Sequence, residues 1–134
     1  MNDPHRPWYH FRPPDGSMSD PNGLKQWKGL YHLFYQYPRT RSPEGRLKAC
    51  WGHAVSEDLV HWRHLPVALE PTSGGPDSDG CASGCALDRD GERVFVYTGV
   101  RPPAVCLATG SHDLVRWHKH RQNPVIPGPP AGPA

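Results

Sequence analysis

Short runs of aromatic and β-branched residues, separated by Gly, Pro, Asp and Asn, make up most of this 134-residue chain. No long apolar run with the period of a helix lies among them. Such short runs between turn-forming residues are typical of β-strands. We therefore predict an all-β protein in which helix is at most a minor component.

One segment of the chain occurs twice, and its flanks repeat as well. Residues 56–62 (SEDLVHW) return as 111–117 (SHDLVRW). The flanking segments correspond in the same order: 23–29 with 84–91, 31–37 with 94–100, and 66–69 with 124–126. An internal repeat of this length indicates that one structural unit is used twice.

Each unit is interpreted as four short strands. The first ends near a Lys-Gly or Asp-Gly turn, the second is rich in Tyr, Phe, Val and Leu, the third runs into Ser-x-Asp, and the fourth follows Trp. Four strands per unit is the architecture of a β-propeller blade. We predict one blade at about 15–70, a second at about 78–127, and a Pro/Gly tail at 128–134.

Two blades cannot close a propeller, which needs about four to eight. The chain is therefore expected to be C-terminally truncated, as part of a larger protein, or to need a partner. Within the repeat, Asp58 and Asp113 are expected to cap the turn after the third strand, because Asp commonly accepts backbone hydrogen bonds there. Trp62 and Trp117 are expected to pack between the blades.

Charge and composition exclude several partners. The formal net charge of +2 is small and the basic residues are scattered, so no nucleic-acid partner is expected. The N-terminus lacks the apolar stretch of a signal peptide and no segment is long enough to span a membrane, so a cytoplasmic location is the expectation. The nine histidines and four cysteines show no ligand spacing, so neither a metal nor another cofactor is expected.

The stretch 17–23 (SMSDPNG) carries one carboxylate, that of Asp20, between two aromatic-rich segments. Asp, Pro, Asn and Gly in this order suit a β-turn, so one interpretation makes Asp20 only a turn residue. The other makes it a catalytic nucleophile that the turn aims.

Several motifs resemble those of glycoside hydrolase family 32, which contains invertases, sucrose-6-phosphate hydrolases and other β-fructosidases. In chain order they are YHF (9–11) with Pro13, MSDPNGL (18–24), YHLFYQY (31–37), WGHAVS (51–56), DLVHW (58–62) and LPVAL (65–69). The resemblance runs from about residue 6 to about residue 130. It implies the N-terminal part of a five-bladed β-propeller whose substrate is a fructose-containing sugar such as sucrose.

The resemblance also assigns site residues. It makes Asp20 the nucleophile that attacks the anomeric carbon of a fructosyl unit. It implies contacts with the sugar from Ser19, Gln36, Trp51 and Ser83. Without the family context, Gln36 is a polar residue at a strand end and Ser83 an ordinary turn serine.

A retaining glycosidase needs a second carboxyl group about 5–5.5 Å from the nucleophile, to protonate the leaving oxygen. In the family this is a Glu followed by Cys, and a third acidic residue lies in Arg-Asp-Pro; the sequence contains neither motif. Asp90 follows Arg89 but precedes Gly91, which predicts a hairpin turn, and Asp3 imitates the nucleophile motif without its flanks.

Departures from the family pattern leave the activity open. Ser17 occupies the usual position of Trp, Ser19 that of a sugar-binding Asn, and Ala82 that of Phe. Smaller side chains at these positions should enlarge the pocket and admit water, which weakens the orientation of the substrate. The alternative to an incomplete β-fructosidase is a non-catalytic propeller remnant that acts as a weak carbohydrate-binding or assembly module.

Overall fold

The computed structural model describes residues 4–5, 9–100 and 102–129. These residues form eight strands and no helix, so no helix in them could cross a membrane. In chain order the strands are β1 (Pro21–Trp27), β2 (Leu30–Arg41), β3 (Leu47–Ser56), β4 (Trp62–Leu69), β5 (Cys81–Arg89), β6 (Glu92–Gly99), β7 (Ala104–Gly110) and β8 (Trp117–Lys119).

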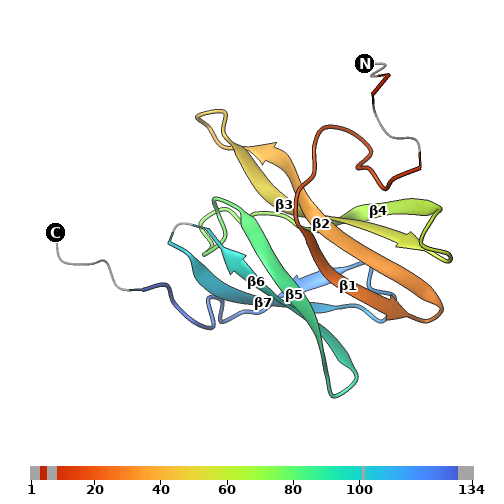
Figure 1. Ribbon diagram of the computed structural model, residues 1–134. Helices are drawn as coiled ribbons and strands as arrows, with labels where there is room; N and C mark the ends of the chain where they lie inside the picture. The colour runs from red at the N-terminus through yellow and green to blue at the C-terminus, as the bar shows by residue number, and fades with distance from the viewer. Residues whose placement is uncertain (1–3, 6–8, 101, 130–134) are drawn as a thin grey trace.

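The strands form two four-stranded antiparallel sheets, ordered β1-β2-β3-β4 and β5-β6-β7-β8 (Figure 1). Within each sheet, strands that follow one another in the chain pair with one another, as in a meander. The prediction of an all-β protein is confirmed. The two sheets lie within the predicted units 15–70 and 78–127, while the tail 128–134 falls mostly outside the described residues, as does Asp3.

The first hairpin of each sheet has the same tight turn. Lys28 and Gly29 connect β1 to β2 with φ of 50° and 80°, and Asp90 and Gly91 connect β5 to β6 with φ of 49° and 84°. Two successive positive φ angles are typical of the type I′ turn, whose twist matches that of the flanking strands. Asp90 is thus a turn residue, as its sequence predicts.

The repeated Ser-x-Asp-Leu segment also folds the same way twice. Asp58 Oδ1 accepts the Val60 and His61 N–H groups at 2.9 and 2.8 Å, and Asp113 Oδ1 accepts the Val115 N–H at 3.1 Å. Both aspartates therefore cap the turn after the third strand. In each turn the following leucine has a left-handed conformation, with φ of 65° at Leu59 and 59° at Leu114. The indole N–H groups of Trp62 and Trp117 donate to those leucine carbonyls.

The main core lies between the two sheets. The ring of Phe95 on β6 stacks on Trp117 with centroids 3.3 Å apart, and it meets Phe34 of β2 edge-on at 4.7 Å. Trp117 also meets Phe34 at 5.5 Å, so it packs between the sheets as predicted. Trp62 differs, because it packs on Phe11 of the segment that precedes β1.

A histidine pair is buried inside the first sheet. His32 Nδ1 and His53 Nε2 are 3.0 Å apart, and the side chains are 4% and 1% exposed. His32 also makes a hydrogen bond with the Trp27 backbone, and one ring of the histidine pair donates to the other according to their tautomers. His53 Nδ1 has no partner among the described residues. Burial, with the nearby His32 and Arg63, lowers the pKa of His53 to about 3, and burial also lowers the pKa of His32.

This pair makes the fold sensitive to acid. Because the folded pKa of His53 is below the unfolded value, the unfolded chain binds more protons, and stability falls as pH drops from about 6.5 toward about 3. Between about pH 6.5 and about pH 4.5 we expect the free energy of unfolding to lose about 2–3 kcal/mol more in the parent chain than in His53→Gln. Urea unfolding measured against pH checks this. The exposed His118→Gln variant should keep the parent's pH dependence; a parent-like slope in His53→Gln would refute the idea.

The two left-handed leucines form a matched pair for mutation. Leu59 is 56% exposed and Leu114 is 1% exposed. A left-handed conformation costs a non-glycine residue about 1–2 kcal/mol, so Leu59→Gly should leave stability within about 1 kcal/mol of the parent or raise it. Leu114→Gly should lower stability by about 2–4 kcal/mol, because the buried side chain is lost. Thermal and urea unfolding of both variants make the comparison; equal losses would contradict it.

Candidate active site

The first strands of the two sheets, β1 and β5, lie side by side (Figure 1). Asp20 directly precedes β1, and Ser83 is the third residue of β5. Two residues far apart in the sequence therefore meet at the same end of both sheets. The Ser83 Oγ–H donates to Asp20 Oδ2 at 2.6 Å.

The structure corrects the turn interpretation of Asp20-Pro21-Asn22-Gly23. Pro21 is the first residue of β1, and the ladder with β2 has an irregularity between Asn22 and Lys25. Gly23 has a φ of +52°, which suits a β-bulge. Pro is tolerated here because β1 is an edge strand and Pro21 begins it. A strand with a bulge, and not a turn, thus aims the Asp20 carboxylate.

The backbone of Asp20 is held by β2. Gln36 N–H donates to Asp20 O at 2.9 Å, and Ser19 N–H donates to Gln36 O at 3.1 Å. Antiparallel pairing thus continues past the first residue of β1. The Asp20 side chain remains exposed, and Ser83 occupies only one of its two carboxylate oxygens. The Oδ1 atom is therefore free of Ser83 and can serve as a nucleophile.

Gln36 and Trp51 are paired across β2 and β3, and both reach β5. The Gln36 side-chain amide donates to Cys81 O at 3.1 Å, and the Trp51 indole N–H donates to Ala82 O at 3.0 Å. Gln36 is 6% exposed and Trp51 is fully buried. In this arrangement the two side chains hold the beginning of β5, and the Trp51 ring presents no exposed face to a ligand.

The structure therefore brings four of the five predicted site residues around the start of β5: Asp20, Gln36, Trp51 and Ser83. The fifth, Ser19, is exposed next to Asp20. Sequence reasoning missed Asn22, which is 3% exposed and whose Oδ1 accepts the Gly84 N–H at 3.3 Å. Its position in the Asp-Pro-Asn-Gly stretch was the available signal, since Asn often bonds backbone groups.

Asp77 is a second carboxylate near the start of β5, and it is 1% exposed. Burial acts to raise its pKa, but hydrogen bonds from Lys119, Tyr97 and the Thr72 N–H hold that pKa below its usual value. A carboxyl group that stays ionised cannot protonate a leaving group. In the part of the chain that the structure describes, no group of three or more His, Cys, Asp or Glu residues is arranged to hold a metal ion.

Residues 10–134 match the family model described as the glycosyl hydrolases family 32 N-terminal domain. The chain belongs to glycoside hydrolase family 32. It is 48% identical over 110 residues to a sucrose-6-phosphate hydrolase of Zymomonas mobilis. That alignment covers 82% of this chain and 20% of the relative. It is 42% identical over 138 residues to a levanase of Bacillus subtilis, which covers 93% of this chain and 20% of that protein.

Solved structures of the family have the same fold. The crystal structure of fructan 1-exohydrolase IIa from Cichorium intybus superposes with a TM-score of 0.83 at 39% identity, covering 96% of this chain and 25% of that one. The sucrose-6-phosphate hydrolase of Lactobacillus gasseri gives a TM-score of 0.76 at 31% identity, covering 90% and 25%. The chain thus spans about a fifth to a quarter of the length of these family 32 relatives.

The role of Trp51 in holding Ala82 can be tested by substitution. Trp51→Phe removes the indole N–H that donates to the Ala82 carbonyl and also shrinks a fully buried ring, so it should lower the free energy of unfolding by about 2–5 kcal/mol. Urea unfolding gives the value. The matched control is Trp62→Phe, whose indole bond to Leu59 O is exposed and should matter less. A loss in Trp51→Phe no larger than in this control would show that the bond does not hold β5.

Proposed function

We propose that this chain carries the nucleophile half of a β-fructosidase site that acts on fructose-containing sugars such as sucrose. The observation that supports this most directly is the hydrogen bond from Ser83 to Asp20, which joins the two sheets at the start of β1 and β5. Relatives that cover most of this chain are named for sucrose 6-phosphate, levan and fructan hydrolysis.

The proposed reaction is a retaining double displacement. Asp20 Oδ1 attacks the anomeric carbon of the fructosyl unit and forms an ester with it, while the bond to the leaving oxygen breaks. Ser83 holds the other carboxylate oxygen, which keeps Oδ1 directed at the sugar. Water then cleaves the ester and releases fructose, leaving Asp20 as a carboxylate.

The remaining predicted residues would supply binding and orientation. Ser19 is exposed beside Asp20 and offers a hydroxyl to the sugar. Gln36 and Trp51 act through the Cys81 and Ala82 carbonyls that they hold, and so fix the position of Ser83. A sugar site needs a few convergent polar groups of this kind.

The acid role is assigned to none of the carboxyl groups in these 134 residues. No glutamate in the sequence precedes a cysteine, and Asp77 is buried and ionised. Without an acid, the leaving oxygen of sucrose must depart as an alkoxide. General acid catalysis contributes about 10²–10⁴-fold to such a step, so its loss is severe.

The first expected outcome is that the purified 134-residue chain shows no measurable hydrolysis of sucrose. Release of glucose and fructose, measured by a coupled assay, gives the answer. Asp20→Asn serves as the blank. Robust hydrolysis that disappears in Asp20→Asn would overturn the view that a second carboxyl group is missing.

The nucleophile can be tested without the acid by using a fructosyl fluoride, because fluoride needs little help from a proton to leave. Asp20 should displace the fluoride and retain the fructosyl group as an ester, because no base is present to activate water. Mass spectrometry of the intact chain and its peptides should show one added fructosyl unit on Asp20. Asp20→Asn should gain none, and Asp88→Asn should label like the parent.

The same labelling experiment distinguishes the proposed enzyme site from the alternative, a non-catalytic module that only binds carbohydrate. That module shows no fructosyl ester in any variant, although fructose can still bind to it. The substitutions at Ser17, Ser19 and Ala82 are the observation that favours this alternative.

A further inference from the structure

Asp77 is a buried carboxylate in the loop between β4 and β5, and the mechanism above leaves it without a role. Its carboxylate accepts hydrogen bonds from its own loop and from strands β6 and β8 of the second sheet. The Tyr97 hydroxyl of β6 donates to Oδ2 at 2.8 Å, the Thr72 N–H donates to Oδ1 at 3.0 Å, and Lys119 Nζ donates to Oδ2 at 2.5 Å. A buried carboxylate with this many donors has little freedom to move.

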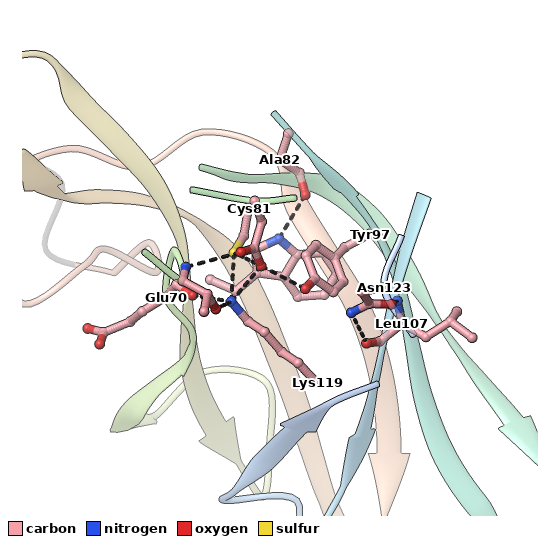
Figure 2. A network of polar contacts seen from close by, with 10 residues as sticks. Glu70, Cys81, Ala82, Tyr97, Leu107, Lys119 and Asn123 are labelled. Carbon is pink, nitrogen blue, oxygen red and sulfur yellow. Dashed lines mark hydrogen bonds and ion pairs between the residues drawn. The ribbon is translucent and has the colours of Figure 1, made fainter. Parts of the chain in front are cut away.

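Lys119 is the last residue of β8, and it reaches back toward the beginning of β5. Figure 2 shows its side chain directed at Cys81 and the Glu70 region, with Tyr97 on the other side of the contact network. Besides Asp77, its ammonium group donates to Glu70 O and to Thr72 Oγ1, the latter at 2.7 Å. The three protons of the ammonium thus have three oxygen acceptors. The outermost strand of the second sheet is tied by this cation to the loop between the sheets.

The network continues into the candidate active site through the backbone of β5. The Cys81 thiol donates to Asp77 Oδ2 at 3.5 Å, and the Gly80 N–H donates to Asp77 O at 2.9 Å. Residues 81, 82 and 83 then each make one contact with the first sheet: Cys81 O with Gln36, Ala82 O with Trp51, and Ser83 Oγ with Asp20. Asp77 therefore contacts the start of this three-residue segment, and the segment's other contacts form the candidate site.

We propose that Asp77 and Lys119 are positioning residues, which set where Ser83 meets Asp20; this rests on the proposed function of that pair. A buried ion pair is weak evidence for stability, because desolvation of both charges offsets their attraction. Its hydrogen bonds are directional, however, and here they bind Thr72, Tyr97 and the start of β5 into one geometry. Position, more than stability, is what this pair supplies to the site.

The first test needs no ligand. Asp77→Asn keeps the shape of the side chain but removes its charge. It also replaces one acceptor oxygen by an N–H₂ group, which cannot accept the hydrogen bonds that Asp77 now accepts. We expect the ¹H–¹⁵N signals of the Ser83 amide and the Trp51 indole to move in this variant of the 134-residue chain. Asp88→Asn is the matched control, because Asp88 is an exposed carboxylate at the far end of the same strand, paired with Lys25 and Arg93. Unmoved Ser83 and Trp51 signals in folded Asp77→Asn would overturn the proposal.

Tyr97→Phe removes a single donor from Asp77 and is the milder variant if Asp77→Asn does not fold. The charge-balanced double variant Asp77→Asn/Lys119→Met is the other. In either variant the chemical shifts of the Ser83 amide and the Trp51 indole should change. Unchanged chemical shifts in a folded variant would overturn the proposal.

The second test asks whether Asp77 acts through Ser83. Fructose affinity, measured by titration of the parent chain, should fall about fivefold in Asp77→Asn, as expected for one lost hydrogen bond. In the Ser83→Ala background the same change should lower it by less than about twofold, because residues in one network are not additive. Equal losses in both backgrounds would show an independent, merely structural effect. If the parent chain binds no fructose, the proposed function fails, while the ligand-free signals still decide the positioning role.

Discussion

The apolar contact between the two sheets is the interaction on which the rest of the structure depends. Phe34 of the first sheet meets Phe95 and Trp117 of the second, and all three rings are largely removed from water. Aromatic side chains of this size bury more area than any other residue, and their edge-on and stacked geometries restrict how the sheets can sit. With the two sheets packed through this contact, their first strands, β1 and β5, lie side by side. Asp20 and Ser83 are thereby brought together.

That apolar interface also explains the polar contacts around the start of β5. Backbone carbonyls that approach a buried aromatic layer lose water and must find donors inside the protein. The Gln36 amide and the Trp51 indole supply them to Cys81 and Ala82. Satisfying these carbonyls fixes the backbone that carries Ser83, so the requirement for buried hydrogen bonds and the geometry of the candidate site have the same origin. The Asp77 and Lys119 network extends that constraint to the outermost strand, β8.

The repeated Ser-x-Asp-Leu segment shows how far a local sequence determines its structure. Both copies form the same capped turn with a left-handed leucine, because the serine and aspartate oxygens satisfy backbone N–H groups within a few residues. The surroundings of the two copies nevertheless differ. Leu114 and Trp117 pack within the core of the second unit and the interface, whereas Leu59 is exposed and Trp62 packs on Phe11. Identical backbone chemistry thus serves two different packing environments.

The sequence by itself determined the strands, the type I′ turns at Lys28-Gly29 and Asp90-Gly91 and the capped repeats, because these depend on residues close together in the chain. The ordered motifs along residues 10–134 also determined the family. Through the family motifs the sequence also indicated Asp20, Gln36 and Ser83. Only the tertiary structure decided that Asp20 precedes a bulged strand and that Ser83 donates to it. It also decided that Trp51 is buried and that Asp77 meets Lys119. These contacts join segments from different strands and sheets, and such pairings depend on how the sheets pack, which no local pattern of residues specifies.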